Sequence, residues 1–271
     1  MGDLPDPVTL RDTPLAEASL HSLNMLAQRG ELFAFPSLSP GSDYSHTNAL
    51  LSILGYDLKK GIPKTEELME LGLDNSASIT DFKSLAPFII PGFSGHGVGI
   101  TTSAWVRGVC KCALISPLDI YSPGSSDAEI LETISNLACR EILKHEFVLI
   151  YVDSPLKASL RGDYDAKKKS LEIIDRHLIN PIADFVWKSE LLIQLAITTD
   201  LITPWHRRIP TEVSVPGILY FNQFDKEGDP EAIFTEISAM MANRNMVNPS
   251  DLIKYLSNFY IEDEEESDLP Y

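Results

Sequence analysis

Short apolar runs alternate along the chain with longer segments of helical spacing. Five runs are rich in aromatic and branched aliphatic residues and are bounded by turn residues, a pattern typical of buried strands. They cover residues 31–35, 98–102, 147–153, 191–198 and 215–221. The run at 147–153 is apolar throughout, which favours a parallel strand buried on both faces.

Apolar residues at helical spacing predict a second set of elements. The predicted helices cover residues 15–29, 45–54, 104–112, 127–144, 163–187, 230–243 and 249–258. Gly30 fits the C′ position of the first helix, and Ser126 offers an N-cap to the fourth. Pro181 marks a break or kink in the fifth helix, and Asp163 opens that helix as a cap.

Strands that alternate with helices predict an α/β protein with three layers, in which an open, mostly parallel sheet is covered on both faces. A chain of 271 residues can bury one substantial core, so a single domain is expected. Its main body is predicted over residues 1–260. Residues 261–271 form a strongly acidic end, which we expect to be a disordered tail or an acidic docking strip for a basic partner.

Composition excludes several function classes. The formal net charge of −17 opposes binding to nucleic acid or to an anionic membrane. The sequence shows neither a run of about 18 apolar residues nor a signal-peptide pattern, so a cytoplasmic location is expected. Cys110, Cys112 and Cys139 lie in apolar segments and are interpreted as reduced core thiols. A metal or redox pair at Cys110 and Cys112 is the alternative, although no further Cys or His lies at ligand spacing.

Several segments resemble, in order, the cofactor-independent phosphoglycerate mutases of the archaeal type, within the alkaline phosphatase superfamily. Phe147-Val-Leu-Ile-Tyr-Val-Asp-Ser-Pro-Leu-Lys-Ala-Ser-Leu-Arg-Gly-Asp163 is similar to the family's His-Val-x-Ala-Pro-Asp-Glu-Ala-x-His-x-Gly-Asp segment. Leu195-Ala-Ile-Thr-Thr-Asp-Leu-Ile-Thr-Pro204 is similar to its Ala-Asp-His-Ser-Thr-Pro segment. Further similar segments are Thr13–Gly30, Pro40–His46, Leu54–Asp57, Ile100–Val109, Asp119–Gly124 and Asp251–Leu256. The resemblance implies an alkaline-phosphatase-like core.

The departures from the family pattern fall on its chemical residues. The resemblance implies two divalent ions, held by Asp and His side chains, that activate a serine for phosphoryl transfer. It assigns the nucleophile to Ser42 and one metal ligand to Asp200. It assigns apolar residues to four other ligand positions: Leu156, Leu160, Leu201 and Pro210. Leucine and proline offer no lone pair to a hard cation, so we expect no bound metal and no other cofactor.

The substrate lid of the family is also expected to be missing. The family inserts a separate domain after the Leu-Gly pair that resembles Leu71-Gly72. Only residues 73–99 fill that interval, and they are too few to form a domain of their own. The family's first metal aspartate ends a strand before Thr13, and the chain is expected to start too late to contain it. A longer reading frame would restore that one residue and none of the other four.

The remaining polar residues each allow a structural and a chemical interpretation. Ser42 is either an N-cap with Asp43 in the first turn or a residual nucleophile. Asp200 either bonds a neighbouring loop or holds a lone cation. A rebuilt metal site from Asp43, His46, Asp200 and His206 is chemically allowed. The run Lys167-Lys-Lys169 is interpreted as an ordinary charged helix face.

One exposed-looking cluster follows Pro204. Trp205, Arg207 and Arg208 can bind phosphate or a partner's carboxylates, or can pair with the acidic body of the protein itself. Two hypotheses from different classes follow. The first is a pseudoenzyme that has lost its metal site and acts as a structural or regulatory subunit, binding a protein partner or a paralogous subunit. The second is a residual phosphotransferase or phosphatase that uses Ser42.

Overall fold

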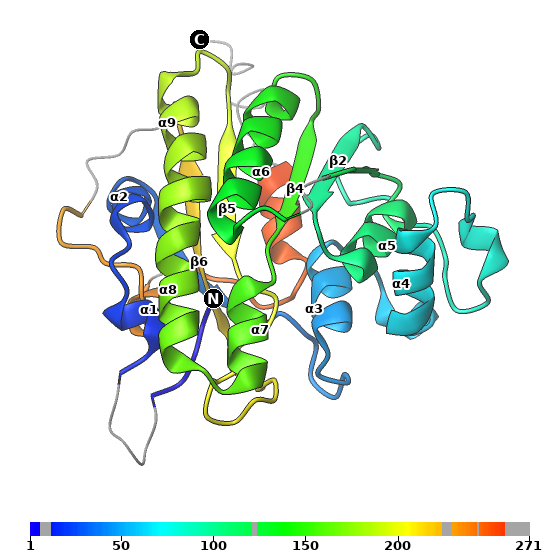
Figure 1. The fold of residues 1–271 in the computed structure, drawn as a ribbon, viewed down its shortest axis with the longest axis horizontal. Helices are drawn as coiled ribbons and strands as arrows, with labels where there is room; N and C mark the ends of the chain where they lie inside the picture. The colour runs from blue at the N-terminus through cyan, green and yellow to red at the C-terminus, as the bar shows by residue number, and fades with distance from the viewer. Residues whose placement is uncertain (6–11, 121–123, 224–228, 243, 258–271) are drawn as a thin grey trace, which may run out of the picture.

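The computed structural model describes residues 1–5, 12–120, 124–223, 229–242 and 244–257 (Figure 1). The predicted acidic end at 261–271 lies outside these residues. Among the described helices, none is long and apolar enough to pass through a lipid bilayer.

All five predicted strands are present, and none of their ends is displaced by more than three residues. The strands are β1 (Glu31–Phe35), β2 (Gly97–Thr101), β3 (Ser116–Leu118), β4 (Phe147–Tyr151), β5 (Gln194–Thr198), β6 (Val215–Phe221) and β7 (Arg244–Asn245). The short strands β3 and β7 were not predicted, because two or three residues show no readable alternation.

The helices are more numerous than predicted. They are α1 (Pro14–Glu17), α2 (His21–Arg29), α3 (His46–Ile53), α4 (Thr65–Leu73), α5 (Ala104–Cys112), α6 (Asp127–Ile142), α7 (Ser154–Arg161), α8 (Tyr164–Ile174), α9 (Asn180–Lys188) and α10 (Glu236–Met241). Residues 251–257 are also helical. Ser126 and Glu129 form a capping box that starts α6, and Asp163 caps α8, as predicted.

The strands form two hydrogen-bonded sheets. One has the order β3-β2-β4 and is entirely parallel. The other has the order β5-β6-β1-β7, and β6 runs antiparallel to both of its neighbours. The predicted α/β class is confirmed, whereas the expected single sheet is divided in two among the described residues.

Helices pack on both faces of the strands, because alternate side chains enter different core clusters, although every residue of β4 is only half-buried. On β4, Val148 and Ile150 pack with α6, α8 and α9, while Leu149 and Tyr151 pack with α4 and α5. Strand β6 behaves in the same way, since Ile218 and Tyr220 belong to the first of these clusters, whereas Val215 and Leu219 belong to a third. Figure 1 shows α6 and the long α8–α9 rod in front of the strands. The three-layer arrangement is therefore confirmed.

Three predicted helices differ from the structure. Residues 15–29 form two helices instead of one, with an extended break at residues 18–20. Pro181 neither breaks nor ends its helix, because a π-helical turn at Asp175–Ile179 joins α8 to α9. The wider π turn accommodates a proline, which lacks an N–H and crowds the preceding carbonyl. The predicted helix at 230–243 shrinks to α10.

The segment at 73–99 packs against α4 and α5 and contributes Leu85 and Ile90 to their core cluster. Helices α4 and α5 lie close together where they cross, because Gly72 of α4 packs directly on the backbone of α5. A Cβ on Gly72 would lie 1.9 Å from the Ala104 carbonyl oxygen.

Burial raises the pKa of Cys110 to about 12 and that of Cys112 to about 11, so both thiols stay protonated as core residues.

Candidate functional site

The ends of β4 and β5 meet at Asp200. This residue lies just beyond β5, and the Tyr151 hydroxyl at the end of β4 donates a hydrogen bond of 2.9 Å to its Oδ2. His46, the first residue of α3, places Nδ1 2.8 Å from the same oxygen. The other carboxylate oxygen accepts the backbone N–H of Leu201 at 2.8 Å. Both oxygens of Asp200 are therefore bound by protein groups.

This arrangement fixes the protonation states of Asp200 and Tyr151. Burial opposes ionisation of Asp200, but His46 and the Leu201 N–H outweigh it and hold the pKa of the carboxyl below its usual value. Burial, together with the charge of Asp200, raises the pKa of Tyr151 well above its usual value. Tyr151 thus remains a donor and Asp200 an acceptor over the whole neutral range. Asp200 bonds neighbouring groups, as its structural interpretation predicts.

The positions that the family resemblance assigns to lost ligands do not converge on a cation site. Leu201 is 3% exposed and packs with Leu38 and Ala49. Leu156 and Leu160 lie one turn apart on α7, and Leu160 is 52% exposed. Pro210 is half-buried in a loop. Across the described part of the chain, no three His, Cys, Asp or Glu residues are placed to hold a metal ion. Leucine and proline side chains offer no lone pair, so Leu156, Leu160, Leu201 and Pro210 cannot themselves be ligands of a cation.

The rebuilt metal site considered from the sequence is not assembled either. Of its four members, His46 and Asp200 are joined by a hydrogen bond, and the second ring nitrogen of His46 lies 3.0 Å from the Thr203 hydroxyl. His206 instead packs edge-on against Trp205, with ring centroids 5.7 Å apart. His46 thus has a hydrogen-bond partner on each of its ring nitrogens.

The prediction that Ser42 caps a helix is wrong. The N-cap of α3 is Ser45, whose side chain accepts the N–H of Asn48. Ser42 lies three residues earlier in a turn closed by its own N–H and the Ser39 carbonyl. The chain carries two suitable cap residues in this stretch, and local pattern alone does not choose between them.

The interpretation of Lys167 as part of a charged surface is also wrong. Its side chain is 2% exposed, and its ammonium donates to Asp3 Oδ2 at 2.7 Å and to the Thr203 carbonyl at 3.1 Å. Burial lowers the pKa of Lys167, and the adjacent Asp3 limits that shift. A sequence signal existed, because Lys167 stands at helical spacing between the core residues Tyr164 and Leu171.

Glu236 completes this second buried cluster from α10. Its carboxylate accepts the Asp3 N–H at 2.7 Å and the Thr13 hydroxyl at 2.8 Å. Burial raises the pKa of Glu236. Because Thr203 contacts both His46 and Lys167, it connects the Asp200 cluster to this one. The two clusters form a continuous polar network beneath the ends of the strands.

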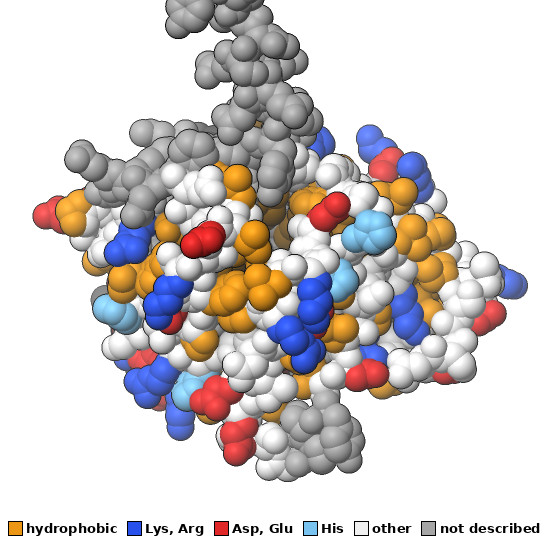
Figure 2. Space-filling model, turned by 90° about the horizontal axis from the view of Figure 1, so that it is seen from above, with side chains coloured by type: hydrophobic (Ala, Val, Ile, Leu, Met, Phe, Trp, Pro, Cys, Tyr) orange, Lys and Arg blue, Asp and Glu red, His pale blue; other side chains and the backbone are white. Residues whose placement is uncertain are grey.

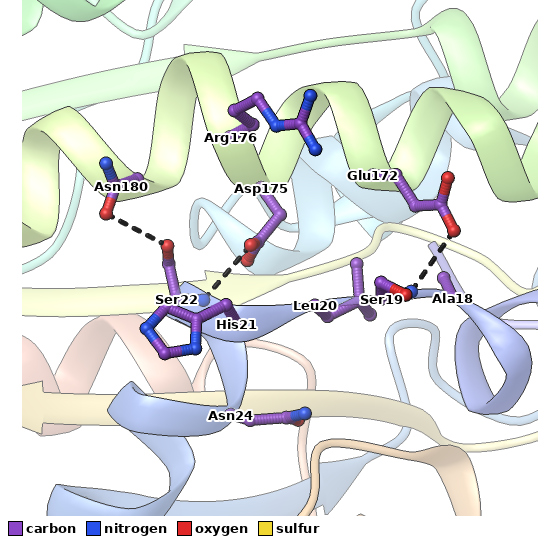
Figure 3. Close-up of a pocket in the computed structure, with 10 residues that line it drawn as sticks. All are labelled: Ala18, Ser19, Leu20, His21, Ser22, Asn24, Glu172, Asp175, Arg176 and Asn180. Atoms are coloured by element: carbon purple, nitrogen blue, oxygen red, sulfur yellow. Dashed lines mark hydrogen bonds between the residues drawn. The ribbon is translucent and has the colours of Figure 1, made fainter.

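A cavity of about 520 Å³ lies elsewhere, between the start of α2 and the α8–α9 rod (Figure 3). Asp175, in the π-helical turn, accepts the N–H groups of Ser22 and Leu23 and so caps α2. Glu172 accepts the N–H of Ser19 in the same way. Figure 3 shows Ser22 directed toward Asn180, to which it donates a hydrogen bond. The carboxylates of this cavity therefore serve to fix α2.

No protein-family model matches the chain. Two archaeal proteins described as 2,3-bisphosphoglycerate-independent phosphoglycerate mutase align with it. The one from Methanosarcina mazei is 28% identical over 120 residues, covering 44% of this chain and 30% of the relative. The one from Aeropyrum pernix is 22% identical over 113 residues, covering 42% of this chain and 27% of the relative. The aligned part thus spans less than a third of these relatives.

Solved structures agree in fold over nearly the whole chain. The PH0037 protein from Pyrococcus horikoshii superposes with a TM-score of 0.71 at 20% identity, covering 100% of this chain and 95% of that one. The cofactor-independent phosphoglycerate mutase from Thermoplasma acidophilum gives a TM-score of 0.63 at 14% identity, covering 94% and 97%. The chain is a distant homologue of the cofactor-independent phosphoglycerate mutases. The expected kinship, and with it the alkaline-phosphatase-like core, is confirmed.

Proposed function

We propose that this mutase homologue is a pseudoenzyme that acts by binding another protein, either an unrelated partner or a paralogous subunit. The observation that carries the proposal is the state of Asp200. Where the family resemblance implies a metal ligand, this carboxylate is satisfied by Tyr151, His46 and the Leu201 N–H. Hydrogen-bond donors of the protein stabilise the negative charge of Asp200, which a bound cation would otherwise stabilise.

The physical chemistry of the apolar substitutions agrees with this proposal. Carboxylates gathered in a buried site without cations repel one another and lose hydration, which costs stability. Leu201 removes that cost, because its side chain joins Leu38 and Ala49 in a small apolar cluster. Helices pack on both faces of the strands, so apolar contacts hold the core together. A scaffold of this kind can persist as a binding protein.

Activity measurements test the loss of catalysis directly. With millimolar Mn²⁺, we expect phosphoglycerate mutase and general phosphatase rates to equal those of a Ser42→Ala variant purified in the same way. The competing hypothesis of a residual phosphotransferase requires a rate above that of the variant. A turnover that depends on both Mn²⁺ and Ser42 would refute the pseudoenzyme proposal.

A further inference from the structure

The cavity between the start of α2 and the α8–α9 rod has the size of a small-molecule site. Its volume of about 520 Å³ falls within the range of ~300–1,000 Å³ that is usual for ligand pockets. Ala18 and Leu20 form an apolar wall just before α2, and the rod supplies polar side chains opposite it (Figure 3). An apolar surface with a few polar groups is the usual composition of such pockets.

Most side-chain acceptors in this cavity are already used by the protein. The two oxygens of Asp175 accept backbone N–H groups at the start of α2. Glu172 Oε1 accepts the N–H of Ser19, and the amide oxygen of Asn180 accepts the Ser22 hydroxyl. Among the described residues that line the cavity, Glu172 Oε2 is the one carboxylate oxygen left without a partner.

The side-chain donors of the cavity are, by contrast, free. The Asn24 amide accepts the Phe234 N–H with its oxygen, and the Asn180 amide is likewise held by its oxygen. Both amide nitrogens therefore lack a partner within the described part of the chain. Neither Arg176 nor His21 forms a hydrogen bond or an ion pair with any residue that the structure describes. The free side-chain groups of the cavity are thus mostly donors.

Glu172 and Arg176 carry opposite charges on the rod without pairing with each other. An acid four residues before a base usually forms an ion pair on a helix. Glu172 instead accepts the N–H of Ser19, and no ion pair joins it to Arg176. Figure 3 shows both side chains on the rod above α2. The cavity therefore presents a positive and a negative group separately, about one turn of the rod apart.

This balance of free groups matches a small molecule that carries both charges. A carboxylate binds a guanidinium and side-chain amides through N–H···O bonds, and an ammonium group binds a free carboxylate oxygen. A simple anion fits less well, because Glu172 and Asp175 repel it, as does the formal net charge of −17. Figure 2 shows acidic and basic side chains interspersed on one face of the molecule. A ligand without net charge avoids this repulsion.

We propose that the cavity binds a free α-amino acid with an apolar side chain. The carboxylate of the amino acid binds Arg176 and the Asn180 amide, its ammonium group binds Glu172, and its side chain lies against the apolar wall. Asp175 holds α2 in place beside the ligand from a π-helical turn, a feature that is frequent at functional sites. This proposal goes beyond the protein-binding function and does not depend on it.

Saturation-transfer NMR on the full chain tests this site through the methyl signals of leucine. We expect leucine to bind with a Kd of about 0.1–1 mM, because exposed charges contribute little affinity. Two analogues keep the same methyl groups: leucinamide lacks the carboxylate, and 4-methylpentanoate lacks the ammonium group. Each should bind at least about fivefold more weakly than leucine, because each loses one charge-assisted contact.

Two variants assign the contacts to residues. Arg176→Met should weaken the binding of leucine at least about fivefold and leave that of leucinamide unchanged, since leucinamide has no carboxylate to lose. Glu172→Gln keeps an oxygen for the Ser19 N–H, and it should weaken the binding of leucine but not that of 4-methylpentanoate. Lys59→Met removes a positive charge from another exposed site and should bind leucine as the wild type does.

Three outcomes would overturn the proposal. The first is an absence of saturation transfer to leucine at millimolar concentration. The second is equal binding of leucine and 4-methylpentanoate to the wild type, which would indicate an apolar or anion site. The third is an equal loss of leucine binding in the Lys59→Met control, which would indicate an effect of net charge alone. The first two outcomes are measured on the wild type, so they hold even where a variant fails to fold.

Discussion

Replacing His46 with alanine probes the polar cluster most sharply. In the wild type the imidazole connects Asp200 Oδ2, at 2.8 Å, to the Thr203 hydroxyl, at 3.0 Å. The side chains of Asp200 and His46 are only 8% and 16% exposed, so solvent compensates poorly for the lost bonds. Asp200 retains Tyr151 and the Leu201 N–H, which spares it the full penalty of an isolated buried charge.

The expected loss follows from these contacts. Removing one partner of a buried ion pair costs about 3–5 kcal/mol when the remaining charge has no other partner. A lost hydrogen bond to a charged group costs about 1.5–3 kcal/mol when other donors remain. Because two donors remain on Asp200, we expect His46→Ala to lower the free energy of unfolding by about 2–3 kcal/mol. Urea denaturation followed by circular dichroism measures this quantity.

A double-mutant cycle separates the pair from general loss of packing. Asp200→Asn removes the charge, so His46→Ala should cost less in that background than in the wild type, by about 1 kcal/mol or more. Additive effects of the two changes would refute the direct coupling of His46 to Asp200. A loss below about 0.5 kcal/mol for His46→Ala alone would place the imidazole outside the stabilising network.

Two further predictions concern other buried contacts. Because burial raises the pKa of Glu236 above its unfolded value, the wild type loses stability as pH rises through the folded-state pKa. The glutamine of Glu236→Gln does not ionise. The melting temperature of this variant should therefore rise relative to that of the wild type as the pH increases from about 4.5. A difference in melting temperature that stays constant with pH would contradict this. Gly72→Ala would force a methyl group onto the Ala104 carbonyl. Urea denaturation should therefore show a free energy of unfolding that is lower by about 1–3 kcal/mol. An unchanged denaturation midpoint would contradict the close crossing of α4 and α5.

The strands were predictable because the chain signals them locally. Phe147–Tyr151 is apolar at every position, and such a run predicts a strand that packs on both faces, although all five residues are only half-buried in the structure. The direction of pairing was not predictable, since nothing within Val215–Phe221 specifies that it runs antiparallel to both neighbours. The break before α2 depends on Asp175, which lies more than 150 residues away in sequence and caps that helix. Local spacing cannot report a contact of that range.

The site was only partly predictable, because local sequence patterns do not report which distant residues are in contact. The sequence grouped His46 with Asp200 only in a metal site that was chemically allowed, and it expected Asp200 to bond a neighbouring loop without naming the His46 imidazole as a partner. It missed Tyr151 because a tyrosine within an apolar strand is ordinarily a core residue. It missed Lys167 because three consecutive lysines are typical of an exposed helix face, although the apolar residues at helical spacing around Lys167 pointed inward.

We propose that hydrogen bonds from protein groups have taken the place of cations at Asp200. Equilibrium dialysis of the purified chain against Mn²⁺, followed by elemental analysis, measures this most directly. We predict that the wild type retains no more Mn²⁺ than its Asp200→Asn variant. Retention of two Mn²⁺ ions per chain, abolished by Asp200→Asn, would contradict the account.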